Sequence, residues 1–280
     1  MRGKLYVCGT PIGNLEDITY RVLSTLKVCD VIYAEDTRHS IKLLNHFDIK
    51  KPLHSYHEHN LVTAGLEIIE KIKSGQQVGL ISDAGMPGIS DPGENIIKLC
   101  IENELDFEVI PGVTAFTTAL VGSGLDTSRF VFEGFLSRDK RQKKKMLERL
   151  KKETRTLLFY ESPHRLKDTL KHLLEIFGDR KMVVARELTK KFETYQRGSV
   201  SELIRFYAET EVKGEIVLVI EGYEETDADR ITYDPEESVI EHVRRYMEEG
   251  NPRKEALKRV AVERNMKKSE VYALLIDEEL

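Results

Sequence analysis

Short, nearly continuous apolar runs recur along the chain and alternate with longer amphipathic stretches. Runs such as KLYVC at 4–8 and IVLVI at 216–220 contain few polar positions, which is typical of strands that helices cover on both faces. The pattern predicts strands over residues 4–8, 28–34, 77–82, 107–110, 130–135, 156–160, 182–186 and 215–221. It predicts helices over 18–26, 40–47, 61–74, 94–102, 114–121, 140–152, 164–177 and 201–208. This alternation of strands and helices predicts an α/β fold.

Two breaks in the pattern predict the domain organisation. Paired glycines interrupt the helical pattern within 121–126, and an acidic stretch follows residue 221. We therefore expect an N-terminal α/β domain over 1–122, a central α/β domain over 123–224, and an acidic linker with a small C-terminal helical subdomain over 225–280. Helices are expected there at 237–249, 252–264 and 268–276. The last two resemble a helix-turn-helix, which either contacts nucleic acid or only stabilises the subdomain.

Charge is distributed unevenly, although the net charge of the 280 residues is only −5. Residues 136–155 hold ten basic and three acidic side chains, and residues 251–270 hold seven basic and three acidic ones. Such patches can dock on phosphates locally, although the first also fits a solvated helix. The sequence has no apolar run of 18 residues, no apolar leader core, and only Cys8, Cys29 and Cys100, all near apolar segments. We expect no membrane span, no secretion and no disulfides, and hence a cytoplasmic protein.

Four glycine-containing turns follow or close predicted strands, at 9–14, 83–93, 111–115 and 132–135. Ligands of open α/β sheets bind beyond the carboxyl ends of the strands. The turn at 83–93 carries Asp83 and Asp91 but no basic residue, so it would repel a pyrophosphate and attract a cation or a hydrogen-bond donor. S-adenosylmethionine, with its sulfonium, ammonium and ribose diol, is one such ligand. The alternative is a tight turn with a purely structural role.

The ordered motifs GTPIGNLEDIT, AEDTR, SDAGMPGISDPG, PGVTA, FEGFL, ESPHR, RELTK and KGEIVLVIEG run from about residue 4 to 222. They resemble the signatures of the tetrapyrrole-methylase superfamily. Within it, they are most similar to the branch that methylates a cytidine 2′-hydroxyl in the decoding centre of 16S ribosomal RNA. The resemblance implies a class III methyltransferase fold, with S-adenosylmethionine held between two α/β domains, and a homodimer acting on the 30S subunit. A same-fold methylase for a tetrapyrrole or another small molecule is the alternative.

The resemblance also implies which residues contact the methyl donor. They come from the four turns, from the strand that ends in ESPHR and from the KGEIVLVIEG motif. They are Thr10, Pro11, Asp83, Gly85, Pro87, Ile89, Ser90, Thr114, Ala115, Phe132, Tyr160 and Gly214.

A base that removes the hydroxyl proton would assist methyl transfer to a ribose. Acidic side chains near strand ends supply the candidates, of which Glu35, Asp36 and Glu161 are preferred over Glu133 and Glu187. Each of them could equally be a helix cap or an ion-pair partner. The neighbouring cations expected to hold the RNA are Arg38, Arg165, Arg186 and Lys190.

The segment HSYHEH at 54–59 resembles a metal site, since His57 and His59 would share a face if the segment were extended. Methyl transfer requires no Lewis acid, so no metal is expected. A polar cluster facing RNA or cofactor and a plain surface segment remain the alternatives.

Overall fold

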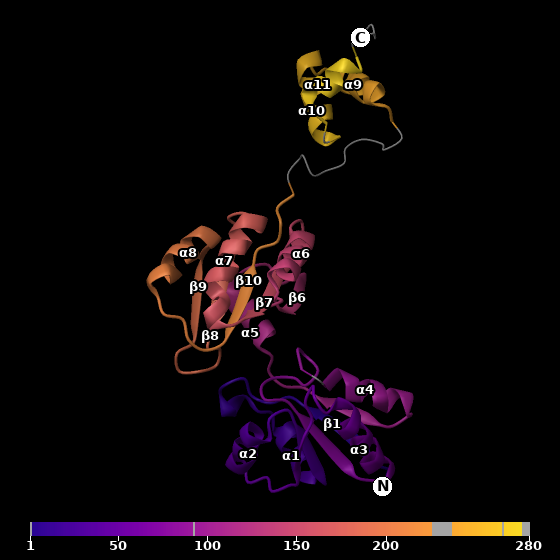
Figure 1. Ribbon diagram of the computed structural model, residues 1–280, viewed down its shortest axis with the longest axis vertical. Helices are drawn as coiled ribbons and strands as arrows, with labels where there is room; N and C mark the ends of the chain where they lie inside the picture. Colours follow the sequence, from indigo (N-terminus) through magenta and orange to yellow (C-terminus); the bar gives the residue numbers. More distant parts are fainter. Residues whose placement is uncertain (1, 92, 226–236, 265, 276–280) are drawn as a thin grey trace. The chain divides into compact units, whose positions relative to one another are not determined.

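The computed structural model describes residues 2–91, 93–225, 237–264 and 266–275. It divides into two compact units, Met1–Gly222, here called the α/β body, and Tyr223–Leu280, the C-terminal unit (Figure 1). Residues 226–236, most of the predicted acidic linker, lie outside the described part of the chain. Among the described residues, no helix combines the length and the apolar character needed to cross a membrane.

The N-terminal sheet is fully parallel, with strand order β3-β2-β4-β1-β5. Its strands are β1 (Lys4–Cys8), β2 (Val31–Ala34), β3 (Leu53–Ser55), β4 (Gln77–Ile81) and β5 (Phe107–Ile110). Alternate residues of β1 enter two cores, because successive side chains of a strand point to opposite faces. Leu5 and Val7 pack with helices α3 (Leu61–Lys73) and α4 (Gly93–Glu102), whereas Cys8 packs with α1 (Tyr20–Val28) and α2 (Thr37–His46).

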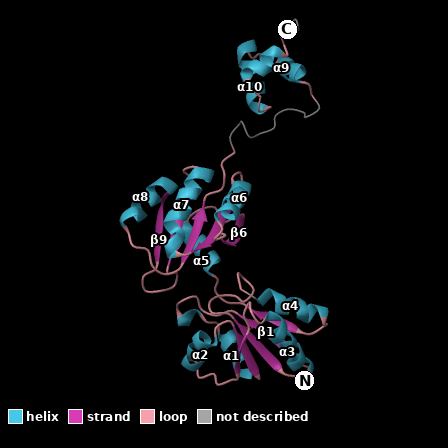
Figure 2. Cartoon of the chain, viewed as in Figure 1, coloured by secondary structure: helices cyan, strands magenta, loops and turns pink. Residues whose placement is uncertain are grey.

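The central sheet is mixed, with strand order β6-β7-β10-β8-β9. Only β6 and β7 are parallel, and the remaining neighbours run antiparallel. Helices α6, α7 and α8 cover one face and α5 covers the other (Figure 2). The strands are β6 (Phe130–Phe135), β7 (Thr156–Glu161), β8 (Lys181–Arg186), β9 (Thr194–Ser199) and β10 (Ile216–Ile220), and the helices are α5 (Ala115–Ser123), α6 (Lys140–Leu150), α7 (Pro163–Phe177) and α8 (Val200–Glu209).

The sequence prediction of an α/β fold with two sheets is confirmed, with differences in individual elements. Strands β3 and β9 were not predicted, because β3 has three residues and β9 (TYQRGS) is a polar edge strand. Strand β2 begins at Val31 and not at residue 28, because α1 continues through Val28 and ends where the Cys29 N–H bonds the Thr25 carbonyl. Cys8, Cys29 and Cys100 are buried free thiols, as predicted.

The C-terminal unit packs three helices around one apolar core: α9 (Val239–Glu248), α10 (Arg253–Glu263) and α11 (Lys268–Ala273). A reciprocal capping box between Ser238 and Glu241 begins α9. The last residue of the predicted helix 268–276 lies outside the described residues. The three predicted helices are therefore present, with slightly shorter bounds.

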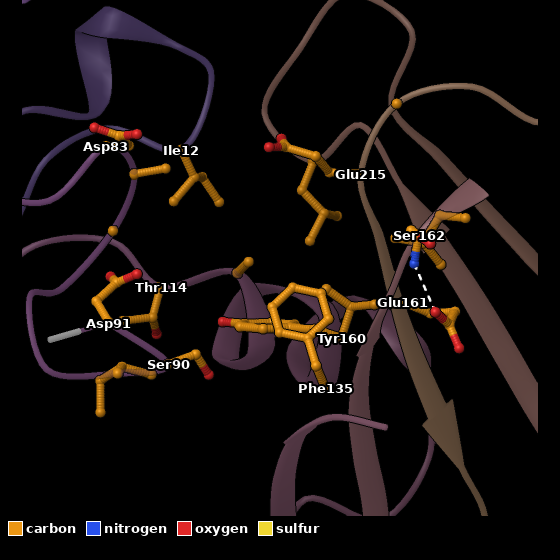
Figure 3. Close-up of a pocket in the computed structure, with 18 of the residues that line it drawn as sticks. Ile12, Asp83, Ser90, Asp91, Thr114, Phe135, Tyr160, Glu161, Ser162 and Glu215 are labelled. Atoms are coloured by element: carbon orange, nitrogen blue, oxygen red, sulfur yellow. Dashed lines mark hydrogen bonds between the residues drawn. The ribbon is translucent and has the colours of Figure 1, made fainter. Parts of the chain in front are cut away.

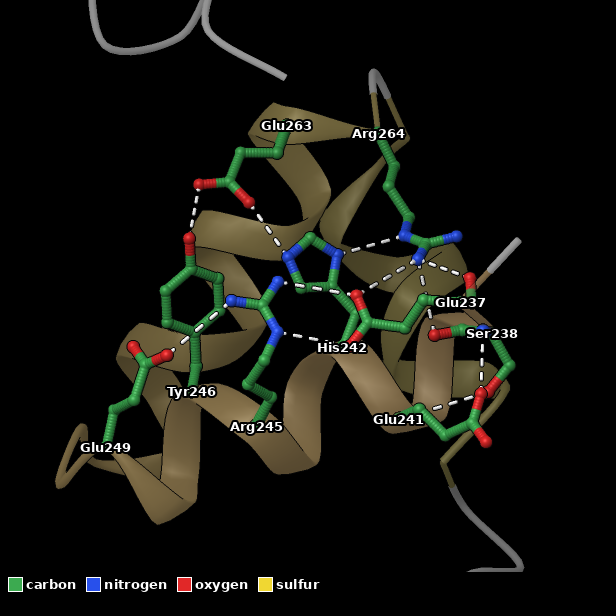
Figure 4. A network of polar contacts seen from close by, with 9 residues as sticks. All are labelled: Glu237, Ser238, Glu241, His242, Arg245, Tyr246, Glu249, Glu263 and Arg264. Carbon is green, nitrogen blue, oxygen red and sulfur yellow. Dashed lines mark hydrogen bonds and ion pairs between the residues drawn. The ribbon is translucent and has the colours of Figure 1, made fainter. Parts of the chain in front are cut away.

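A buried histidine organises the polar contacts of this unit (Figure 4). His242 is 0% exposed, its Nε2 lies 2.9 Å from Glu263 Oε2, and its Nδ1 accepts a hydrogen bond from Arg264 Nε. Because arginine can only donate, the imidazole proton resides on Nε2, facing the carboxylate. Burial lowers the pKa of His242, so the neutral ring joins α9 to the end of α10.

Candidate functional site

The loops that follow β1, β4 and β5 meet at one edge of the N-terminal sheet, because these strands are neighbours in the order β4-β1-β5. Thr10 and Gly85 exchange backbone hydrogen bonds of 2.8 and 3.1 Å between the first two loops. A side chain at Gly9 would stand 2.8 Å from the Cα of Gly112, so glycine there permits the close approach of the first and third loops. The three predicted turns therefore form one tightly connected rim.

A cavity of about 380 Å³ opens at this rim (Figure 3), within the size range of small-molecule sites. The N-terminal half contributes the turn at 83–91, the end of the loop before α5 and the first residue of that helix, and the central half contributes residues in or beside β6, β7 and β10. The lining residues are Ile12, Asp83, Ala84, Gly85, Met86, Ile89, Ser90, Asp91, Thr114, Ala115, Phe135, Tyr160, Glu161, Ser162, Pro163, Leu188, Gly214, Glu215, Ile216 and Val217.

Acidic side chains line both sides of the cavity: Asp83 and Asp91 lie on the N-terminal side, and Glu161 and Glu215 on the central side, where aromatic and aliphatic side chains predominate. Asp83 and Asp91 face the cavity from one side, and Tyr160 and Phe135 face it from the other, with ring centroids 5.3 Å apart (Figure 3). None of the described residues that line it is a lysine, arginine or histidine. Ser90 has φ 63°, a left-handed conformation that costs a non-glycine residue about 1–3 kcal/mol and must be held by its surroundings.

The carboxyl group of Asp91 interacts with a second carboxyl group, that of Glu35. Burial, together with the negative charges of Glu35 and Asp83, raises the pKa of the Asp91 carboxyl to about 7. Burial and the charge of Asp83 also raise the pKa of Glu35. Two neighbouring carboxyl groups that both have raised pKa values favour a state near neutral pH in which one of them keeps a proton.

The residues expected to contact a methyl donor are distributed over this region. Asp83, Gly85, Ile89, Ser90, Thr114, Ala115, Tyr160 and Gly214 line the cavity. Thr10 and Pro11 line a smaller hollow next to it. Phe132 stacks on Phe116 at 4.4 Å and meets Tyr160 edge-on at 4.9 Å, so it supports the aromatic wall from behind. Pro87 is outside both linings.

The expected catalytic acids occupy different environments. Asp36 caps helix α2 and binds Arg38 at 2.7 Å, which holds the pKa of its carboxyl down at about 2. Glu161 belongs to the lining, but its carboxylate accepts bonds from Ser162 N (2.8 Å) and Thr169 Oγ1 (2.6 Å), and the side chain is fully buried (Figure 3). Glu35 does not line the cavity and contacts it through Asp91.

The four cations expected to hold RNA all have internal partners. Arg38 pairs with Asp36, and Lys190 lies 2.9 Å from Glu187 and 2.7 Å from Glu215. Arg165 donates to the carbonyls of Leu136 and Ser137, and Arg186 to that of Lys213.

The basic run at 136–155 forms α6, and part of it is also engaged internally. Lys143 is buried and lies 2.6 Å from Asp168, and Lys144 pairs with Glu175 at 3.0 Å.

The histidine segment does not have the geometry that its spacing suggested. Residues 57–60 follow β3 as loop and turn and not as a strand, so the extended geometry in which His57 and His59 would share a face is not formed. Their rings meet edge-on at 5.8 Å, and His54 stacks on Tyr33. No group of three or more His, Cys, Asp or Glu side chains within the described ranges could hold a metal ion.

Sequence reasoning named Asp91 as one of the two carboxylates of the turn at 83–93 but assigned it no catalytic role, and it did not single out Phe135, Leu188 or Glu215 as lining residues. Phe135 ended the predicted turn at 132–135. Their positions beside strand ends were the available signal. The sequence does not show how the N-terminal and central halves pack together, and this packing directs these side chains into one cavity.

A parallel sheet whose carboxyl-end loops close an acidic cavity against a second, mixed sheet defines the class of the molecule. Residues 4–204 match the family Tetrapyrrole (Corrin/Porphyrin) Methylases, and the chain belongs to this family. Solved structures share the fold. Uroporphyrin-III-C-methyltransferase from Thermus thermophilus aligns with a TM-score of 0.55 at 22% identity, over 79% of this chain and 94% of that one. Diphthine synthase aligns with a TM-score of 0.61 at 16% identity, over 79% and 90%.

Nearer relatives define the branch of the family. Ribosomal RNA small subunit methyltransferase I of Bacillus subtilis (strain 168) is 49% identical over 96% of this chain and 93% of its own length. The protein of that name from Synechocystis is 44% identical over 98% of both chains. The one from Thermotoga maritima is 48% identical over its entire length, which covers 79% of this chain. The chain is therefore a methyltransferase of this branch.

Proposed function

We propose that the chain transfers the methyl group of S-adenosylmethionine to the 2′-hydroxyl of a decoding-centre cytidine in 16S ribosomal RNA. Relatives at 42–49% identity that carry the name ribosomal RNA small subunit methyltransferase I support the RNA substrate. The uroporphyrin-III and cobalamin-biosynthetic methyltransferases that share this fold are only 16–22% identical. One observation carries the choice of methyl donor: the cavity presents Asp83 and Asp91 and has no cationic side chain in its described lining.

The lining residues fit S-adenosylmethionine in charge and in polarity. Two carboxylates suit its sulfonium and ammonium groups, and the hydroxyls of Ser90 and Thr114 can bond polar groups of the ribose or the amino acid. The apolar wall formed by Leu188, Phe135 and Tyr160 excludes water from the remaining, less polar part of the bound S-adenosylmethionine. Desolvation strengthens the attraction between the carboxylates and a cation.

The bound donor supplies an electrophilic methyl group on a good leaving group, so the protein's main task is to align the acceptor. We assign the acceptance of the hydroxyl proton to Asp91. It lines the cavity, and its raised pKa, about 7, suits a base that works near neutral pH. Glu161 accepts hydrogen bonds from Thr169 and the Ser162 N–H and lies 3.4 Å from Arg165, and Asp36 is paired with Arg38. We infer that these two acids are structural.

We infer that the C-terminal unit contacts RNA but is not essential for methyl transfer. The Thermotoga relative aligns over its full length with 222 residues of this chain, the length of the α/β body. About a fifth of this chain therefore has no counterpart in the Thermotoga relative, although that relative carries the same name as the Bacillus and Synechocystis proteins. This difference favours an RNA site in the α/β body. We also infer a homodimer that works on the 30S subunit in the cytoplasm.

The test is tritium transfer from labelled S-adenosylmethionine to 30S subunits, to naked 16S RNA and to a tetrapyrrole acceptor. The proposal expects label in RNA, in one nucleotide that resists alkaline hydrolysis because its 2′-oxygen is blocked. Label on a base would contradict the reaction type, and label in the tetrapyrrole alone would contradict the substrate. The same assay on a chain ending at Gly222 is expected to retain activity with weaker RNA binding.

A further inference from the structure

A second hollow of about 230 Å³ lies against helix α2. The first loop forms one wall, helix α2 forms the other, and the lining residues are Thr10, Pro11, Gly13, Leu15, His39, Lys42, Leu43, His46 and Asp83. Among the described residues, Asp83 alone lines both this hollow and the cavity. The two spaces therefore meet at the carboxylate assigned to the methyl donor. We call the hollow the α2 groove.

The wall formed by α2 is basic. His39, Lys42 and His46 are spaced three and four residues apart, which places them along one face of the helix. All three are exposed. Leu15 is exposed and Leu43 half-buried, so these two add apolar surface beside them, whereas Pro11 is buried at the base of the groove. A groove with both apolar and cationic walls matches a nucleotide, which has an apolar base face and an anionic phosphate.

Lys42 differs from the cations that the sequence suggested for RNA binding. Arg38 and Lys190 are each held by one or two carboxylates, so a phosphate would have to displace those partners. Across the described ranges, no carboxylate forms an ion pair with Lys42. A phosphate at Lys42 therefore gains a charge partner without breaking an existing one.

We propose that the α2 groove binds single-stranded RNA flanking the methylated nucleotide, with a backbone phosphate on Lys42 and a base against the exposed side chain of Leu15. The inference rests on the proposed function and names the substrate contact of the same site. Asp83 repels phosphate, so the phosphate lies at the Lys42 end of the groove and the ribose of the target nucleotide lies toward the cavity. Single strands suit this groove because their unstacked bases are free to enter it.

The test compares the full-length chain with Lys42→Glu and with the control Lys27→Glu. Lys27 is an exposed lysine on α1 that does not line the groove, so both variants change the net charge equally. For Lys42→Glu we expect the KM for 30S subunits to rise about tenfold, with kcat and the Kd for S-adenosylmethionine unchanged. The slope of log Kd for a single-stranded RNA oligomer against log salt should fall by about one. Lys27→Glu should change each quantity less than twofold.

The outcomes separate this inference from the proposed function. Equal behaviour of Lys42→Glu and Lys27→Glu, with active wild-type protein, would overturn the groove and leave the function standing. An equal loss of binding to duplex RNA would overturn the assignment to single strands. If the wild-type protein transfers no methyl group to RNA, the proposed function fails. Fluorescence anisotropy with the oligomer then tests the groove directly, since undiminished binding by Lys42→Glu would overturn it as well.

Discussion

The two halves of the α/β body bring different chemistry to one cavity. The N-terminal half is a parallel sheet whose strands all end at the same edge, and its loops supply Asp83, Asp91 and the Thr114 hydroxyl. The central half is a mixed sheet that supplies mainly aromatic and aliphatic side chains, such as Phe135, Tyr160 and Leu188. Parallel strands gather polar loop ends at one edge, whereas antiparallel neighbours alternate their ends.

This difference separates two tasks that one surface could not perform equally well. Carboxylates recognise positive charge, but their attraction is weak while water surrounds them. The apolar wall contributes little specificity, but it removes that water. Asp91 and Tyr160 are both half-buried, so the cavity already removes part of the water around them, and this burial contributes to the raised pKa of each group. Substitutions on the two sides should therefore have different signatures.

The largest effect is expected for Asp91→Asn, which keeps the size of the side chain and removes the proton acceptor. We expect kcat to fall by about 10²–10⁴-fold, measured by single-turnover methyl transfer at pH 8. In the wild type, the rate should rise as the pH increases through about 7, because Asp91 must be ionised to accept a proton and its pKa is raised. Asp91→Asn within threefold of the wild-type rate would exclude Asp91 as the base.

Glu35→Gln sharpens the same prediction. Removing the negative charge beside Asp91 lowers the pKa of Asp91, so the rise in kcat/KM should move to lower pH.

Asp91→Asn should also stabilise the protein at pH 8. A carboxyl group whose pKa is raised by folding opposes folding once it is ionised, and the amide removes that cost of about 1–2 kcal/mol after allowance for solvent screening. Thermal unfolding at pH 5 and pH 8 measures this difference.

A smaller effect is expected for Asp83→Asn. The Kd for S-adenosylmethionine should rise about 10–100-fold, the loss expected when a partly buried charge pair is broken. Asn retains an oxygen that can accept the 3.0 Å bond from Asp36 N, so the fold should persist. The Kd for S-adenosylhomocysteine, which has no sulfonium charge, should change less. Calorimetry with both ligands checks this, with the exposed Asp106→Asn as the control.

The sequence predicted the N-terminal side of the site better than the central side. The turn at 83–93 shows its carboxylates and glycines directly, and its place after a buried strand fixes the edge of the sheet where it lies. The central wall depends on tertiary packing. Phe135 reaches the cavity after a bulge at Glu133–Gly134, where the pairing of β6 and β7 shifts and Gly134 has φ 66°. A glycine inside a strand is a local sign of a bulge, but the sequence does not show with which residues of the partner strand pairing resumes.

Charges were the least predictable feature, because a sequence shows each charge but not its partner. Glu161 and Arg165 appear in one motif and were expected to act on substrate, yet they lie 3.4 Å apart with the carboxylate buried. Arg38 is held by the residue two positions before it. No sequence motif marked Lys42 as a ligand-binding residue, although it lines the α2 groove. Which ionisable groups remain available is decided by the folded neighbours of each one.

The smallest effect is expected for Phe135→Ala, and it probes the apolar half of the comparison. Phe135 contributes about 40 Å² of apolar contact if half of its exposed ring is covered on binding, which corresponds to about 1 kcal/mol, or a rise in Kd of about fivefold. Because this contribution is independent of charge, the Kd for S-adenosylmethionine and for S-adenosylhomocysteine should rise by the same factor. Phe192→Ala, at an exposed phenylalanine outside the cavity lining, is the matched control. A loss confined to the charged ligand would mean that the aromatic wall recognises the sulfonium through its ring face, and the division of tasks between the two halves would have to be abandoned.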